Sequence, residues 1–210
     1  MSTDVEICNM SLSLIGQSPI VSLAGTDNVS KTCNVHFQQA VDWVLSQRNW
    51  RSAITRASLS TPDGTPVYGW AHYYDYPADC LRVLEVRTTE LEDDSVNGTR
   101  WSSEGRTILS DSADGIKVRY IKSIAITDIP THVVDVVALE VARRIVIPIT
   151  NSNKMRQSLS SMMFGEGKAD KGWLAEAAAV DGQQGRTRVL RTSKLVGVRM
   201  QNTSIAGPYV

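Results

Sequence analysis

Several features that would indicate a particular class of function are missing from this 210-residue sequence. Neither charge is in excess, because 22 Lys and Arg residues balance 22 Asp and Glu residues. A neutral chain is poorly suited to non-specific binding of nucleic acid through its whole surface. No apolar run is long enough to span a bilayer, and the acidic start, Met1 to Glu6, lacks the basic segment of a secretion signal. We therefore expect neither a membrane-spanning segment nor a leader.

Cysteine is scarce, and this bears on the compartment. The three cysteines, Cys8, Cys33 and Cys80, lie far apart, and no Cys-x-x-Cys pair occurs. Such a distribution is typical of buried thiols in a reducing cytosol rather than of a disulfide framework.

The residue patterns of common catalytic and metal sites are also missing. The three histidines are too scattered for a metal set, and no Gly-x-Ser-x-Gly sequence occurs. The spacing of Gly165, Gly167 and Lys168 is not that of a phosphate-binding loop. Asp75 and Asp79 flank a proline in a predicted turn, where aspartate has a local structural reason to occur. We expect no catalytic residues, no metal site and no cofactor.

What the sequence does contain is helical periodicity at both ends. Thr3 and Glu6 have the capping-box spacing, and apolar residues at steps of three and four follow until Gly16. A second helix is predicted from about residue 27 to 49, antiparallel to the first. Pro130 begins a third helix that is apolar around most of its circumference, which is typical of a central helix. A long fourth helix follows, with a kink or break near Gly165 to Gly167.

The middle of the chain changes to a period of two. Residues 81–87 and 115–122 alternate, and Asn97-Gly98 is a strong hairpin signal. In the first of these strands the alternation places Leu81, Val83 and Glu85 on one face. These patterns predict a small antiparallel sheet with one face covered.

A proline-containing segment, Tyr73 to Leu84, leads from the helical section into the sheet. Pro77 fixes a turn, aromatic rings suit half-buried positions, and the strand begins directly afterwards. We predict a domain junction made by Trp50, Tyr74, Tyr76, Pro77, Cys80 and Arg82.

Together these patterns predict an α+β fold. Its helical bundle domain, of about four helices, comprises residues 1–56 and 130–182. A small antiparallel β domain, residues 57–129, is inserted into it, and residues 183–210 form an extended basic C-terminal arm.

The predicted arm has positive charges, several apolar residues and no acidic residue after Asp181. Three alternatives remain open for it: a solvated tail, docking on a partner protein, or direct contact with DNA. We favour docking on an acidic partner surface. The residues expected to do this are Arg186, Arg188, Arg191, Lys194, Leu195 and Arg199.

Taken in order, several segments between residues 3 and 181 resemble the head-to-tail adaptor proteins of short-tailed bacteriophages, also called tail tubular protein A. The most specific is the run Tyr74-x-Tyr76-Pro77-Ala78-Asp79-Cys80-Leu81-Arg82. The glycine-broken last helix and the long basic tail depart from the family pattern. The other segments that carry the resemblance are Leu12 to Gly16, Arg48 to Trp50, Arg56 to Leu59, Val118 to Ile121 and Ala138 to Ala142.

The resemblance implies a fold and a function. Such adaptors have a helix bundle with an inserted β domain. They assemble in the host cytoplasm as a ring, typically of twelve copies, and this ring is part of the virion. The ring binds the portal protein and the tail nozzle protein and continues the channel through which the genome DNA passes without specific binding. The C-terminal segment is commonly extended and docks on the portal. The resemblance therefore implies a structural, non-enzymatic protein.

Two alternatives remain beside the adaptor: another head-completion or stopper ring protein, and a tail-associated hydrolase. For a ring, Arg143 and Arg144 are candidates for pairing with the acidic run Glu90 to Asp94 of a neighbouring subunit.

Overall fold

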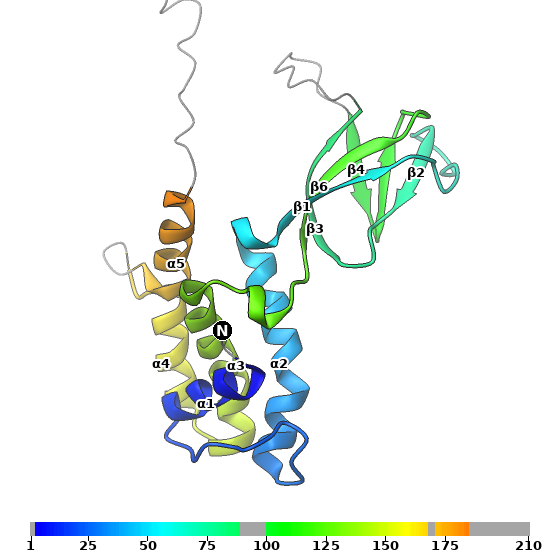
Figure 1. Cartoon of the computed structure of the whole chain (residues 1–210). Helices are drawn as coiled ribbons and strands as arrows, with labels where there is room; N and C mark the ends of the chain where they lie inside the picture. Colours follow the sequence, from blue (N-terminus) through cyan, green and yellow to red (C-terminus); the bar gives the residue numbers. More distant parts are fainter. Residues whose placement is uncertain (1–2, 89–99, 168–170, 185–210) are drawn as a thin grey trace, which may run out of the picture.

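The computed structural model describes residues 3–88, 100–167 and 171–184, and it has the expected α+β composition. All its strands lie in one stretch of sequence, and helices come before and after that stretch (Figure 1). The helices are α1 (Asp4–Leu14), α2 (Asn28–Gln47), α3 (Thr131–Thr150), α4 (Asn153–Phe164) and α5 (Gly172–Gln183). Single-turn 3₁₀ helices, η1 (Arg51–Ala53) and η2 (Ile126–Asp128), lie at the two connections between the helical part and the β part.

Helix α3 is at the centre of the helical part, as its nearly all-round apolar sequence predicted. Helices α1, α2, α4 and α5 all pack against it. The predicted antiparallel pairing of the first two helices is wrong, because α1 packs mainly on α3 and touches α2 little. Pro148 does not stop α3, which continues to Thr150 and ends at Asn151 in a left-handed conformation with φ of 51°.

The predicted long fourth helix is in fact two helices, so the described residues contain five and not four. Gly165 ends α4 with φ of 79°, and α5 begins at Gly172 with φ of 68°. A Cβ at Gly172 would lie 2.5 Å from the backbone of Gly165 and Met163, so the chain packs too tightly there for a side chain. The glycines marked the break correctly, but the separation into two helices depends on this close approach.

The β part is two antiparallel sheets and not the single sheet predicted. One has the order β1-β6-β3 and the other the order β2-β5-β4. The strands are β1 (Ile54–Leu59), β2 (His72–Asp75), β3 (Cys80–Arg87), β4 (Trp101–Glu104), β5 (Thr107–Ser110) and β6 (Ile116–Lys122). The hairpin predicted at Asn97-Gly98 lies outside the described residues.

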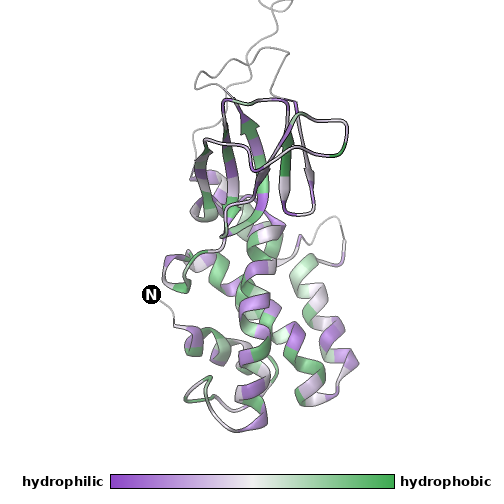
Figure 2. Cartoon of the chain, turned by 90° about the vertical axis from the view of Figure 1, so that its right-hand side faces the viewer, coloured by the Kyte–Doolittle hydropathy of each residue, from purple (hydrophilic) through white to green (hydrophobic). Residues whose placement is uncertain are grey.

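Each part has its own hydrophobic core. The core of the helical part contains residues of all five helices, together with Trp50 and Ile121. The smaller core of the β part comprises Tyr74, Cys80, Val86, Ile108, Ile116, Val118 and Tyr120. The β part projects from one end of the helical part, and the strands stand above the helix ends (Figures 1 and 2). Within the described ranges, no helix combines the length and apolar character needed to cross a membrane.

Candidate functional site

The most distinctive region is the place where the β part joins the helices, and its key element is β3. Pairing of β3 with β6 runs Cys80–Lys122, Arg82–Ile121, Val83–Tyr120 and Glu85–Arg119, so the register shifts twice. Leu81 and Leu84 are the extra residues at these two β-bulges, and both pack against the helical core.

The bulges change the spacing of side chains along the strand. Cys80, Val83 and Val86, at steps of three, face the core of the β part. The prediction that Leu81 and Val83 share a face is therefore wrong. A bulge re-aims the residues around it, and here two bulges let a single strand supply apolar side chains to both cores.

Polar contacts join the two parts beside these leucines. Arg82, exposed on β3, donates to Asn49 Oδ1 at the end of α2 over 2.5 Å. The Ser123 hydroxyl, just after β6, donates to Asp42 Oδ1 of α2 over 2.8 Å. Apolar and polar contacts together fix the β part on the end of α2.

The structure brings only part of the predicted junction set to the junction. Trp50 is fully buried in the helical core, and its indole N–H donates to Val44 O over 2.8 Å. Pro77 forms the expected turn, in which its carbonyl accepts from Cys80 N over 2.9 Å. Arg82 joins the two parts directly, as described above.

The remaining predicted junction residues belong to the β part. Tyr74 is fully buried there, and its hydroxyl donates to Ser112 O over 2.7 Å. Tyr76 packs at the edge of the same core, and its hydroxyl is hydrogen-bonded to Ser103. Cys80 is buried, and burial raises the pKa of its thiol to about 11. The residues that do contact the helices are Leu81, Leu84 and Ile121. Sequence patterns could not identify them, because their positions depend on the register of the sheet.

A cavity of about 520 Å³ opens at this junction, and four of its ten lining residues are arginines. Arg48 and Arg51 come from the end of α2 and from η1, whereas Arg82 and Arg119 come from β3 and β6. The acidic residue in the lining is Asp181 of α5. We call this cavity the four-arginine pocket. Sequence reasoning missed it, because its residues are distributed over positions 48 to 182.

The carboxylate of Asp181 is already engaged within the chain. It is 4% exposed, it accepts from the backbone N–H of Arg51 over 3.1 Å, and His132 Nε2 lies 3.6 Å from Oδ1. It therefore ties α5 to the start of η1, and the ion-pair partner recorded for it is His132 and not an arginine of the pocket.

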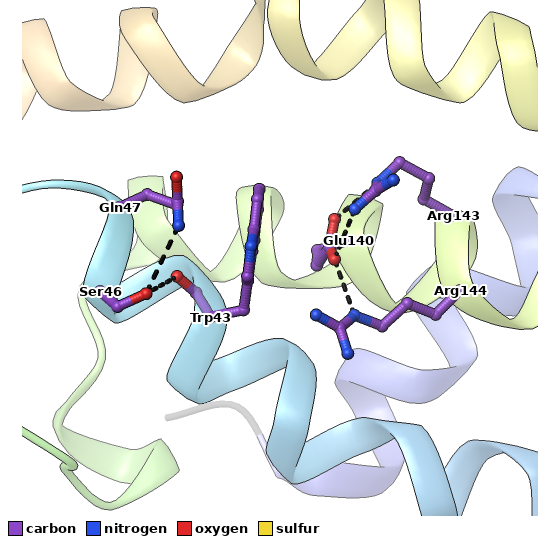
Figure 3. A network of polar contacts seen from close by, with 6 residues as sticks. All are labelled: Trp43, Ser46, Gln47, Glu140, Arg143 and Arg144. Atoms are coloured by element: carbon purple, nitrogen blue, oxygen red, sulfur yellow. Dashed lines mark hydrogen bonds and ion pairs between the residues drawn. The ribbon is translucent and has the colours of Figure 1, made fainter. Parts of the chain in front are cut away.

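A second charged cluster lies inside the helical part (Figure 3). Glu140 of α3 is fully buried and accepts from Arg143 over 2.7 and 2.8 Å and from Arg144 over 2.7 Å. The Arg143 guanidinium also lies 5.5 Å from the ring centre of Trp43 and 5.9 Å from that of Phe164. Both arginines thus have a partner in their own chain, and the acidic run proposed to pair with them across subunits lies outside the described residues.

An exposed apolar pair lies on the connection between β1 and β2. The side chains of Val67 and Tyr68 are 99% and 87% exposed. The structure divides the aromatic-rich stretch from Val67 to Tyr76. Tyr74 is core, whereas Val67 and Tyr68 point into solvent.

Other predicted site residues have no described environment. The docking-arm residues Arg186, Arg188, Arg191, Lys194, Leu195 and Arg199 lie outside the described residues. Within the described ranges, no three His, Cys, Asp or Glu residues are placed to hold a metal ion.

Comparison with known proteins gave no relative: no protein-family model matches the chain, and no curated protein is significantly similar to it.

Proposed function

We propose that this chain is a ring-forming structural protein of a phage virion, a head-to-tail adaptor that joins the portal to the tail nozzle. The sequence resemblance implies a helix bundle with an inserted β domain. The observation that best supports the proposal is that the strands are inserted between α2 and α3 and rest on the helical core through Leu81 and Leu84. A rigidly held projection of this kind suits a subunit that contacts different partners at its two ends.

In this role the helices form the ring wall and the β domain projects from it. A closed ring needs head-to-tail contacts, in which one face of a subunit complements a different face of the next. Permanent assemblies of this kind bury about 2,000 Å² or more at each contact. The exposed pair Val67 and Tyr68 is one apolar surface available for such contacts.

The C-terminal residues 183–210 are the proposed portal-docking arm. Their charge favours an acidic partner surface, whereas tight binding to DNA phosphates would hinder passage of the genome. Truncation after Gly182 should leave the fold intact and abolish attachment to the portal. Attachment of the truncated chain with unchanged affinity would remove the arm from the proposal.

The function itself is tested by measuring the mass of the purified protein with and without a portal ring. We expect a closed ring, of twelve copies on the portal, which particle images would show directly. A stable monomer that ignores the portal and hydrolyses a cell-wall substrate would overturn the adaptor proposal in favour of a tail-associated enzyme. A ring that binds the tail components but not the portal would indicate a different ring of the same particle.

A further inference from the structure

Among the described residues, the four-arginine pocket has fewer acidic groups than arginines: Asp181 is in its lining, and Glu85 lies beside Arg119. Arg48 and Arg51 have no ion-pair partner among the residues that the structure describes. Arg82 binds the neutral Asn49, and Arg119 Nη1 lies 3.6 Å from Glu85 Oε2 while its Nε is buried without a hydrogen-bond partner. Guanidinium groups converging on one cavity repel one another, and they present the planar donors that bind carboxylates in pairs.

We propose that this pocket binds the acidic run Glu90-Leu91-Glu92-Asp93-Asp94 of a second copy of the chain. Four of the five residues in this run are acidic, so its charge is opposite in sign to that of the arginines in the pocket. The inference rests on the proposed ring, and it names the contact that connects one subunit to the next.

The length of the chain limits which part of the run can reach the pocket of its own molecule. Arg82 lies in the pocket, and β3 runs away from it to Arg87. Six residues of bulged strand place Thr88 roughly 15 to 20 Å from Arg82. Glu90 is only two residues further on, and two residues reach about 7 Å at most. The start of the run is therefore short of its own pocket, whereas Asp93 and Asp94 have enough chain beyond Thr88 to span about 20 Å. The choice of a second molecule rests on the proposed ring, and the charge swap below tests it.

The geometry of this contact also fits a ring. The pocket is at the end of β3 nearest the helices, and the acidic run follows the opposite end. The contact therefore joins two different parts of the chain, the pocket of one subunit and the acidic run of the next. Such heterologous contacts close into rings when the rotation between subunits permits.

The first experiment measures binding of a fluorescent peptide of residues 88–96 to the full-length chain by anisotropy. We expect saturable binding that weakens with salt, and at least a tenfold higher Kd in the double variant Arg48→Glu/Arg51→Glu. The control, Lys154→Glu/Arg156→Glu on α4, makes the same change of charge away from the pocket and should bind as the wild type does. Should the double variant fold poorly by circular dichroism, Arg48→Gln/Arg51→Gln replaces it, with the same direction of effect.

Two results of this experiment would overturn the proposal. One is peptide affinity that does not depend on Arg48 and Arg51. The other is a short DNA duplex that binds more tightly than the peptide through the same arginines, since the pocket would then be a nucleic-acid site.

The second experiment is a charge swap followed by sedimentation velocity, with and without portal. Arg48→Glu/Arg51→Glu and Glu92→Arg/Asp93→Arg should each weaken ring formation, and their combination in one chain should restore it. Rings that form equally well in all these variants would overturn this inference and leave the adaptor role intact. Peptide binding by a chain that never forms a ring on the portal would keep the pocket assignment and remove the adaptor role.

Discussion

Leu81 and Leu84 contact the same helical core although they are three residues apart in a β-strand, since each is the extra residue of a β-bulge in β3. In a regular strand, residues three apart point to opposite faces. The two bulges therefore attach the β part to the helices, and they do so with apolar contacts rather than with a flexible linker. This attachment gives the first prediction.

Leu84→Ala should destabilise the junction by about 2 kcal/mol, the lower end of the range for truncating a leucine in a core, because Leu84 is only partly buried. We expect faster amide hydrogen exchange in β1, β3 and β6, and in the double variant with Leu81→Ala separate thermal transitions of the two parts. The matched control is Val83→Ala, which packs on the core of the β part. A single sharp transition in the double variant, with exchange unchanged at the junction, would show that these leucines do not hold the two parts together.

Glu140 gives the second prediction, because its single carboxylate binds two arginines from a fully buried position. Glu140→Gln keeps the size of the side chain but leaves both guanidinium groups without their counter-charge. The free energy of unfolding should fall by about 2 to 3 kcal/mol, since breaking a buried pair from one side is costly. Urea unfolding followed by circular dichroism measures the change.

Asp135→Asn, which removes an exposed charge from the same helix, should change stability by less than about 0.5 kcal/mol. Equal effects of the two substitutions would contradict a structural role for the cluster.

Much of the local structure could be predicted from the sequence. The capping box at Thr3 and Glu6 is present, with hydrogen bonds of 2.8 and 3.2 Å. The strands predicted at residues 81–87 and 115–122 are also present. These features depend on residues close together in the sequence, and local side-chain chemistry is enough to determine them.

The features that the sequence did not predict depend on contacts between distant residues. Alternation predicted one sheet and a regular β3, whereas the pairing with β6 introduces two bulges. The four-arginine pocket joins residues of α2, β3, β6 and α5, so no motif of fixed spacing marks it. From the sequence, Arg143 and Arg144 were candidates for pairing with a partner subunit. Only the packing of α3 shows that Glu140 is buried beside them.

The cysteines give the third prediction. All three are buried, as expected, but the sequence did not indicate that the thiols of Cys8 in α1 and Cys33 in α2 would be neighbours. The interaction with Cys33 and burial raise the pKa of the Cys8 thiol, which keeps it protonated and unreactive. Ellman's reagent should therefore find almost no reactive thiol in the native protein over minutes at pH 8, and three thiols in 6 M guanidinium chloride. Rapid reaction of one thiol in the native protein would show that one of the three sites is open to solvent.

Tyr120 gives the fourth prediction, which concerns stability at high pH. Its side chain is buried in the core of the β part, and its hydroxyl donates to Asp79 Oδ1 over 3.0 Å. Burial, and then the bond to Asp79, raise the pKa of Tyr120 to about 12. An unfolded tyrosine ionises near pH 10, at about its ordinary pKa. Between these values the unfolded state loses a proton that the folded state keeps, so the free energy of unfolding falls as pH rises from about 10 to 12. Below pH 10 the contribution is fully present.

Urea unfolding at a series of pH values from 8 to 11.5 measures this loss, and absorbance near 295 nm follows ionisation in the native state. Tyr120→Phe should be less stable than the wild type at pH 8, because it loses the bond to Asp79, and its stability should fall less steeply above pH 10. Some fall should remain, since burial also raises the pKa of Cys80, to about 11. Tyr68→Phe, at an exposed position, should keep the slope of the wild type. Identical slopes in all three proteins would mean that Tyr120 ionises equally easily in the folded and unfolded states, which its buried bond to Asp79 does not allow.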